Sequence, residues 1–441
     1  MNQISKKFTW LELIKFSLPP VAMMLLTSLY TAVDGIFVSQ FVGSDALSSI
    51  NIILPLDGII CGIGIMLGTG ASAVIGLFLG EKKDKKAKES FSLVTFAGIL
   101  IGGIMSVSLL TFLPEIVRFL GASDKLYPYC MDYARIMFLF AIPYILQVMF
   151  NSLFVTAGKP SLALKVSIIC GLSNLVLDYL FIVVCNMGIS GAAWGTVLSR
   201  LFGGIFPIYY FLKHKEGLCF EKTNWNWKIL NAALSNGSSE MVSNIAAGVT
   251  TFLFNITMMK LLGEDGVAAM TIVLYTQFIF TAVFFGFSNS AAPVISYNYG
   301  SNDTTYLKKL MKYCLTIIGA CTVAMMGGAI LFAKPVIALF TSPGSSVYEL
   351  AYSGYILFIW NFIFAGFNIF TSSMFTALSN GFISALLSFL RTFIFIVGFA
   401  LTLPRFFGVD GLWLSVPAAE LLAAILAVIL IIRHRKVYHY Y

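Results

Sequence analysis

Apolar runs long enough to cross a membrane recur along almost the whole chain, with only short connectors between them. They begin near residues 13, 46, 90, 129, 161, 188, 229, 265, 310, 347, 382 and 411. A membrane-spanning helix needs about 20 apolar residues. Only 11% of the residues are charged, less than half of the roughly 25% found in soluble domains. We therefore expect an all-α polytopic membrane protein with twelve transmembrane helices, and we exclude a soluble enzyme, a nucleic-acid-binding protein and a disordered chain.

Lysine and arginine are distributed unevenly between the two expected sides of the membrane. If the N-terminus is cytoplasmic, the opposite side holds few of the 28 basic residues, namely Arg118, Lys125, Arg135, Lys260, Lys334 and Arg405. Two more, Arg200 and Arg391, lie within spans. The others lie on the same side of the membrane as the N-terminus. Because basic loops stay in the cytoplasm, we expect both termini to be cytoplasmic and the protein to lie in the cell membrane.

The second half of the sequence repeats the first at a constant offset. The clearest matches are Gly43-Ser-Asp45-Ala-Leu with Gly263-Glu-Asp265-Gly-Val, and Gly188-Ile-Ser-Gly191 with Gly408-Val-Asp-Gly411. Each half holds six expected spans, so the halves share one topology and are related by a pseudo-two-fold axis along the membrane normal. We expect six-helix lobes at residues 1–212 and 229–441, a cytoplasmic connector at 213–228, and a substrate cavity between the lobes.

Residues suited to catalysis or cofactor binding are scarce in the spans. The three histidines, His214, His434 and His439, lie in connectors or the tail, and the seven cysteines form no CxxC pair. The chain also lacks the GxxxxGK[ST] loop that holds ATP phosphates. We therefore expect no cofactor and no enzyme activity, with a membrane-embedded enzyme as the remote alternative.

Ionisable residues within the spans are the main functional candidates, because each costs roughly 2.5–3.5 kcal/mol to insert. They are Asp34, Asp57, Asp178, Arg200, Glu240, Arg391 and Glu420. Tyr30 lies one helical turn before Asp34, and Asn174 lies one turn before Asp178. Each of these pairs therefore shares a helix face.

Three different spans place oxygen-bearing side chains at a similar depth. Counting about 1.5 Å per residue from the outer ends puts Asp34, Asp178 and Thr196 in one layer of the outer half. Such a set can hold Na⁺, or one proton shared between two carboxylates. The alternative is hydrogen bonding that only joins helices. Arg200 could also pair with Asp178, which would compete with a bound cation.

The remaining ionisable residues have other expected roles. Arg391 and Glu420 lie at compatible depths in the last two spans and are expected to form a structural ion pair. Asp57 and Gln277 occupy equivalent repeat positions and are expected to line the substrate cavity, although helix contact explains them equally well. Glu240 has no evident basic partner, which suits a cationic substrate, with hydrogen-bonded burial as the alternative.

Four short segments together resemble the multidrug and toxic compound extrusion (MATE) transporters. They are Tyr30-Thr-Ala-Val-Asp34-Gly-Ile-Phe-Val, the Gly43…Ala46-Leu47 loop, Asn174-Leu-Val-Leu-Asp178, and Gly188-Ile-Ser-Gly191-Ala-Ala-Trp-Gly-Thr196. The resemblance covers essentially the whole chain. It implies an efflux antiporter that exports amphipathic, often cationic compounds in exchange for Na⁺ or H⁺, by alternating access of two lobes.

The resemblance also implies a site for the coupling cation and a set of partners. The family's amino-terminal cation site falls on Tyr30, Asp34, Asn174, Asp178 and Thr196. Another branch of the family uses an acid in span seven, and whether Glu240 contacts substrate or cation stays open, as does Na⁺ against H⁺. We expect drug-like or cationic small molecules and membrane lipid as partners, no nucleic acid, and a monomer. A flippase for lipid-linked precursors or polysaccharides is the alternative within the same superfamily, and its pyrophosphate cargo would require a basic cavity.

Overall fold

The structure is a computed structural model that describes residues 3–440, and helices form nearly all of that range, without a strand. The first bundle contains α1 (Trp10–Phe41), α2 (Ser44–Gly80), α3 (Asp84–Thr111), α4 (Leu113–Phe119), α5 (Tyr127–Leu139), α6 (Ala141–Thr156), α7 (Pro160–Asp178), the π-helical segment η2 (Tyr179–Val184) and α8 (Gly188–Lys213). The second bundle contains α9 (Trp227–Gly300), α10 (Thr304–Leu331), α11 (Ala333–Ala338), α12 (Ser346–Phe358), η3 (Ile359–Asn361), α13 (Phe362–Ala377), α14 (Gly381–Phe389), the π-helical η4 (Leu390–Ile396) and α15 (Val397–Tyr438). A short 3₁₀ turn, η1 (Gln3–Ser5), precedes both.

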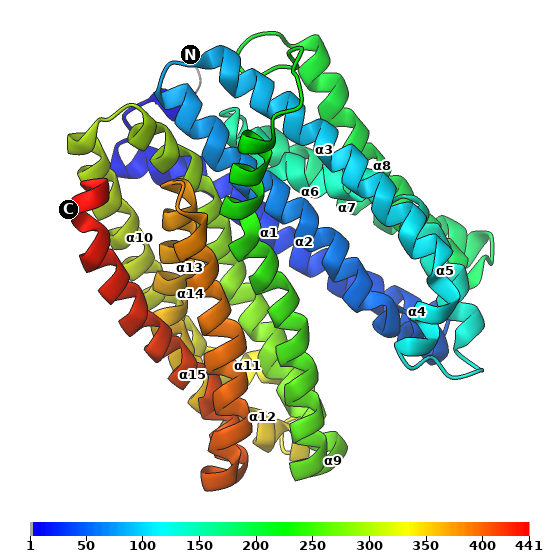
Figure 1. Cartoon of the computed structure of the whole chain (residues 1–441). Coiled ribbons are helices and arrows are strands. Elements are labelled where there is room, and N and C mark those ends of the chain that lie inside the picture. Colours follow the sequence, from blue (N-terminus) through cyan, green and yellow to red (C-terminus); the bar gives the residue numbers. More distant parts are fainter. Residues whose placement is uncertain (1–2, 441) are drawn as a thin grey trace.

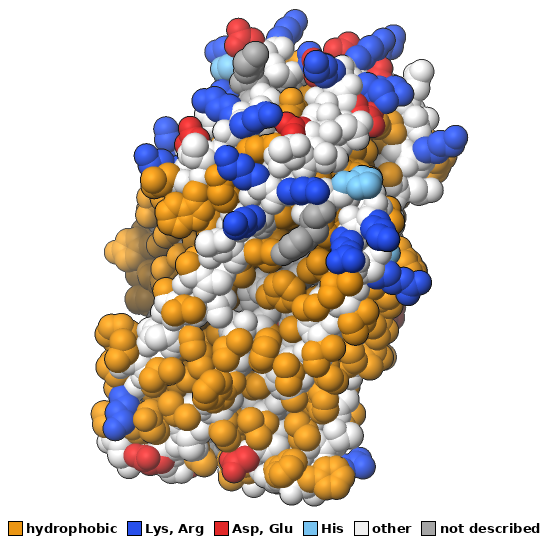
Figure 2. All heavy atoms as spheres, turned by 90° about the vertical axis from the view of Figure 1, so that its left-hand side faces the viewer, with side chains coloured by type: hydrophobic (Ala, Val, Ile, Leu, Met, Phe, Trp, Pro, Cys, Tyr) orange, Lys and Arg blue, Asp and Glu red, His pale blue; other side chains and the backbone are white. Residues whose placement is uncertain are grey.

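The two bundles lie against each other near the chain termini and diverge toward the opposite end (Figure 1). Figure 2 shows hydrophobic side chains over the middle of the molecule, whereas Lys and Arg gather at the end where both termini lie. Since a lipid bilayer requires an apolar surface of this kind, the distribution of side chains is that of a membrane-spanning protein.

The predicted repeat is visible in the helix boundaries. α3 begins at Asp84 and α10 begins at Thr304, which is the same offset that separates Gly43 from Gly263 in the sequence. Gly43, between α1 and α2, has φ +117°, and its counterpart Gly263 has φ +69° inside α9. Because other residues avoid this left-handed region, Gly263 breaks α9 where Gly43 separates the first two helices.

The all-helical membrane architecture is confirmed, whereas the count of twelve spans stays a prediction. Within the described range, nine helical stretches are long and apolar enough to span a membrane. Counting the pair α5 and α6, which is bent by 59°, as one span gives ten. Two of the nine stretches, Trp227–Gly300 and Gly381–Tyr438, each contain a non-helical glycine, Gly263 and Gly408.

The start of the chain packs on the second bundle. A capping box between Thr9 and Glu12 begins α1, with the Thr9 N–H donating to Glu12 Oε2 at 2.8 Å. Four apolar side chains of this region lie in the core of the second bundle: Ile4, Phe8, Leu13 and Phe16. At the surface Lys7 Nζ lies 2.6 Å from Asp303 Oδ2, and this contact lowers the pKa of Asp303. α1 therefore crosses from one bundle to the other.

Glycines bring the two bundles into backbone contact at the end where the termini lie. A Cβ at Gly80, the last residue of α2, would overlap the carbonyl oxygen of Tyr297 in α9. A Cβ at Gly300 would likewise overlap the carbonyl oxygen of Leu77. The two contacts are counterparts in the repeat, so the pseudo-two-fold axis passes between them. We call this pair of contacts the glycine clasp.

Candidate functional site

Two carboxyl groups, one fully buried and one half-buried, face each other inside the first bundle. Asp34 lies on α1, and Asp178 is the last residue of α7, where the chain passes into the π-helical η2. Their side chains are within hydrogen-bonding reach of each other. Asp178 is fully buried and has the Asn174 amide beside it as a hydrogen-bond donor, whereas Asp34 Oδ1 has no donor among the described residues. Because carboxylate oxygens only accept hydrogen bonds, this pair requires a proton or a cation between its members.

The other three residues of the predicted cation site lie around this pair. Asn174 Nδ2 donates to Thr196 Oγ1 at 3.5 Å, which joins α7 to α8 one turn from Asp178. A Cβ at Gly195 would overlap Asp178 Oδ1, so glycine leaves the space that the carboxyl group fills. A Cβ at Gly171 would lie 3.2 Å from the Tyr30 ring, which therefore packs directly on α7. The fold thus gathers all five predicted residues from α1, α7 and α8.

Arg200 pairs with Asp57, and the alternative pairing with Asp178 does not occur in this structure. Its Nη1 lies 2.9 Å from Asp57 Oδ1, and its guanidinium lies 3.5 Å from the centroid of the Tyr144 ring. The Tyr144 hydroxyl donates to Asp57 Oδ2 at 3.2 Å. Since the guanidinium is engaged elsewhere, the Asp34–Asp178 pair is left available for a cation.

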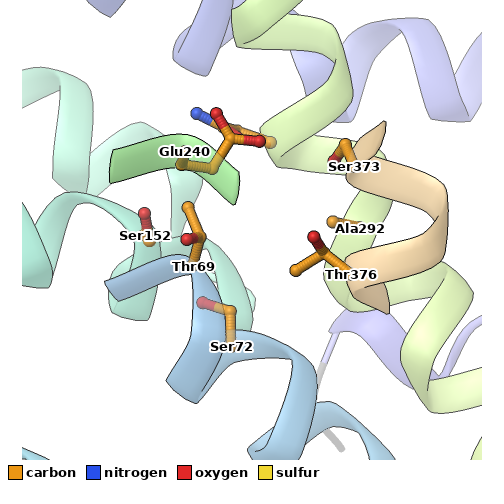
Figure 3. A pocket seen from close by; sticks show the side chains of 8 residues that line it. Thr69, Ser72, Ser152, Glu240, Ala292, Ser373 and Thr376 are labelled. Atoms are coloured by element: carbon orange, nitrogen blue, oxygen red, sulfur yellow. The ribbon is translucent and has the colours of Figure 1, made fainter. Parts of the chain in front are cut away.

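A small cavity that is lined mainly by polar residues lies between the bundles (Figure 3). Its walls come from α2, α6, α9 and α13, through Thr69, Ser72, Ser152, Glu240, Asn289, Ala292, Ser373 and Thr376. Ser72 and Ala292 are equivalent positions of the repeat, so the cavity lies near the pseudo-two-fold axis. Glu240 is its acidic residue. Asp57 and Gln277 are half-buried outside this cavity, so their role as substrate-cavity residues stays a prediction.

The structure brings Arg391 and Glu420 together inside the second bundle. Arg391 Nε donates to Glu420 Oε1 at 2.8 Å, and its Nη2 lies 2.7 Å from the same oxygen. Asn368 Nδ2 donates to the other carboxyl oxygen of Glu420 at 2.6 Å. Glu420 occupies the repeat position that Arg200 has in the first half. Each bundle therefore places one member of an ion pair at this position, and the two residues have opposite charge.

Replacing Glu420 with glutamine is expected to destabilise the protein by about 3–5 kcal/mol, because it leaves the buried Arg391 guanidinium without its counter-charge. Thermal unfolding of the detergent-purified protein measures the effect as a lower Tm. The exposed Glu115 is the matched control, and Glu115→Gln is expected to unfold like the unmodified protein. An unchanged Tm for Glu420→Gln would contradict this role.

Sequence reasoning did not identify Tyr144 or the hydroxyl residues of the cavity. Tyr144 is one of 19 tyrosines, and serines and threonines are common in membrane helices, so type and spacing did not set these residues apart.

Within the described residues, no group of three or more His, Cys, Asp or Glu side chains is arranged to hold a metal ion.

Comparison with known proteins agrees with the repeat and the fold. The MatE family model matches residues 19–180 and again 241–402, one copy in each half. The chain is 25% identical over 422 residues to the multidrug export protein MepA of Staphylococcus aureus (strain MRSA252), covering 95% of this chain and 92% of MepA. MepA of Staphylococcus haemolyticus (strain JCSC1435) is 25% identical over 333 residues, which is 75% of this chain and 73% of that protein.

Solved structures show the same architecture. An outward-facing multidrug resistance MATE family transporter of the MOP superfamily superimposes with a TM-score of 0.91 at 23% identity, covering 97% of this chain and 96% of that one. A MATE crystal structure in the bent conformation gives a TM-score of 0.89 at 23% identity with the same coverage. With both halves matched by the family model, the chain belongs to the MATE family.

Proposed function

We propose that this protein is a secondary active multidrug efflux antiporter that exports amphipathic, cationic compounds in exchange for H⁺ or Na⁺ by alternating access. The observation that carries the proposal is the pair of facing carboxyl groups, Asp34 and Asp178, of which Asp178 is fully buried. The name of the relative MepA, a multidrug export protein, supports efflux.

The coupling cation binds between Asp34 and Asp178 in this proposal. A proton would be shared between the two carboxyl groups, and Na⁺ would take oxygens from them and from Asn174, Thr196 and Tyr30. One monovalent cation that enters down about 100 mV releases about 2.3 kcal/mol, which is sufficient for more than a tenfold gradient of the exported compound. Binding of a proton or Na⁺ would bend or shift α1, because Pro19 and Pro20 interrupt the hydrogen bonds of this helix.

The charge of the cavity supports a cationic substrate. Glu240 is the charged residue among those that line it, and its neighbours there are mostly hydroxyl and amide groups. An anionic lipid-linked precursor would instead require basic residues at this place. We propose that the protein lies in the cell membrane as a monomer, with both termini in the cytoplasm, where the basic end of the molecule would meet anionic lipid headgroups.

Purified protein in liposomes tests the proposal. A fluorescent cationic dye is loaded, and inward Na⁺ and pH gradients are imposed separately. Dye export driven by one of the two gradients is the expected result. Dye export at a rate that does not depend on either gradient would overturn the antiporter assignment. Export of an anionic lipid probe without export of the cationic dye would favour a flippase.

A further inference from the structure

Arg200 is a basic residue that interacts electrostatically with Tyr30 and Asp34 of the proposed cation site, although its ion pair is with Asp57. Its guanidinium is bound to Asp57 on α2, with Nη1 to Oδ1 at 2.9 Å and Nη2 to Oδ2 at 3.4 Å. Thr196, a member of the predicted site, precedes Arg200 by one turn of α8 and lies on the same face. The basic side chain is therefore positioned between α2 and the Asp34–Asp178 pair.

The interior of the first bundle has more negative than positive groups. Asp34 interacts electrostatically with both Arg200 and Asp57, so Arg200 lies within electrostatic reach of Asp34 while it is in direct contact with Asp57. The titratable and charged groups that face this cluster come from α1, α2, α5, α6, α7 and α8, and they are Tyr30, Asp34, Asp57, Cys61, Tyr133, Tyr144, Cys170, Asp178 and Arg200. A guanidinium has five N–H donors, and the contacts with Asp57 use only two of its nitrogens.

Asp57 lies at the boundary between the two bundles. Its side chain is 23% exposed, and a Cβ on the next residue, Gly58, would lie 3.8 Å from Asn244 Oδ1 of α9. An Asp57 carboxylate without its guanidinium would therefore present a negative charge toward the space between the bundles. The Asp34–Asp178 pair, by contrast, is enclosed by α1, α7 and α8.

We propose that Arg200 is a positioning residue that exchanges its partner between Asp57 and the Asp34–Asp178 pair. This inference rests on the proposed antiport and gives it a mechanism. With a coupling cation on the aspartate pair, Arg200 stays on Asp57 and neutralises it. When the cation leaves, Arg200 turns to the aspartate pair, and Asp57 becomes free to attract a cationic substrate.

The exchange explains how the coupling cation and the substrate exclude each other without sharing a site. The cation binds the aspartate pair, and the substrate is attracted by Asp57. Because Arg200 can neutralise only one of these two places at a time, binding of the cation at one place weakens binding of the substrate at the other. Because coupling between two ligands is reciprocal, the substrate must weaken cation binding by the same factor as the cation weakens substrate binding.

Binding of tetraphenylphosphonium to the purified full-length protein tests the exchange. This probe carries a permanent positive charge, so any effect of pH or Na⁺ on its Kd reports on the protein. In the unmodified protein, acid or Na⁺ is expected to raise the Kd by about tenfold or more. In Arg200→Gln the probe should bind more tightly, and the ion effect should fall below about twofold. Arg200→Lys, which keeps the charge, should retain the effect.

A second variant acts in the opposite direction on affinity. Asp57→Asn should bind the probe more weakly, and its ion effect should also be lost, because Arg200 is then free to neutralise the aspartate pair permanently. The control is Arg391→Gln, which breaks the buried ion pair of the second bundle and should keep the ion effect while lowering the Tm. If Arg200→Gln is not stable enough to purify, Asp57→Asn and Arg200→Lys still decide the question.

The outcomes separate this inference from the antiport on which it rests. If the unmodified protein shows no effect of either ion on probe binding, the proposed antiport fails. If the unmodified protein shows the effect and Arg200→Gln or Asp57→Asn retains it, the antiport stands and the exchange of partners is contradicted.

Discussion

Replacing Asp178 with asparagine is expected to uncouple transport, so that an imposed Na⁺ or pH gradient no longer drives dye export. Asparagine has nearly the size of aspartate, but it cannot take up a proton or neutralise a cation at this buried position. Since one cation supplies about 2.3 kcal/mol per 100 mV, its loss should reduce gradient-driven export by about tenfold or more. Asp34→Asn should have the same effect, because the two carboxyl groups act as one site.

The matched control for both variants is Asp124→Asn. Asp124 is also an aspartate of the first bundle, but its side chain is 95% exposed and pairs with Arg118 at the surface. This variant should export dye like the unmodified protein, since exposed ion pairs contribute little. Gradient-driven export that survives in Asp178→Asn and Asp34→Asn would show that the coupling cation binds elsewhere.

Enlarging the glycines of the clasp is expected to open the end of the molecule where the termini lie. In Gly80→Leu and Gly300→Leu the new side chain would overlap a backbone oxygen of the other bundle, which cannot move aside as a side chain can. Overpacking of this kind costs roughly 1–3 kcal/mol, and each 1.4 kcal/mol changes a two-state ratio by about tenfold. The bundles should therefore spend more time apart at this end.

Spin labels on two exposed lysines measure this opening. Lys86 lies near the start of α3 in the first bundle, and Lys308 lies near the start of α10 in the second. In both clasp variants the distribution of distances between the labels should shift to longer values. Gly319→Leu is the control, because a Cβ there meets no atom within 4 Å. An unchanged distribution in both clasp variants would show that the glycines do not hold the two bundles together.

The sequence predicted the fold well because the apolar runs and the repeat are both readable without knowledge of packing. Twelve runs that recur at a constant offset require two similar bundles, and the glycines at 43 and 263 mark the same break in each. The crossing of α1 was not predictable in this way. Ile4, Phe8, Leu13 and Phe16 are apolar in either bundle, and only packing decides that they lie in the second.

For the candidate site, the sequence could give depth along a helix but not which helices face each other. Asp34 and Asp178 were expected at one depth, and the fold brings their side chains together. Arg200 could have reached Asp57 or Asp178, and nothing in the spacing favours one. The choice depends on the Tyr144 ring, which holds the guanidinium beside α2. The role of Gly195 was also not predictable from the sequence, because only the packing of α8 on α7 shows that its lack of a Cβ leaves space for the Asp178 carboxyl group.

Infrared difference spectroscopy of the purified protein tests the central claim most directly, because it detects protonated carboxyl groups. Raising the pH or adding Na⁺ should remove a protonated carboxyl band in the unmodified protein. That band should change in Asp34→Asn and in Asp178→Asn, should be missing from the variant that combines them, and should be retained in Asp124→Asn. A carboxyl band that responds to pH or Na⁺ unchanged in both site variants, or no responsive band in the unmodified protein, would contradict a cation held by Asp34 and Asp178.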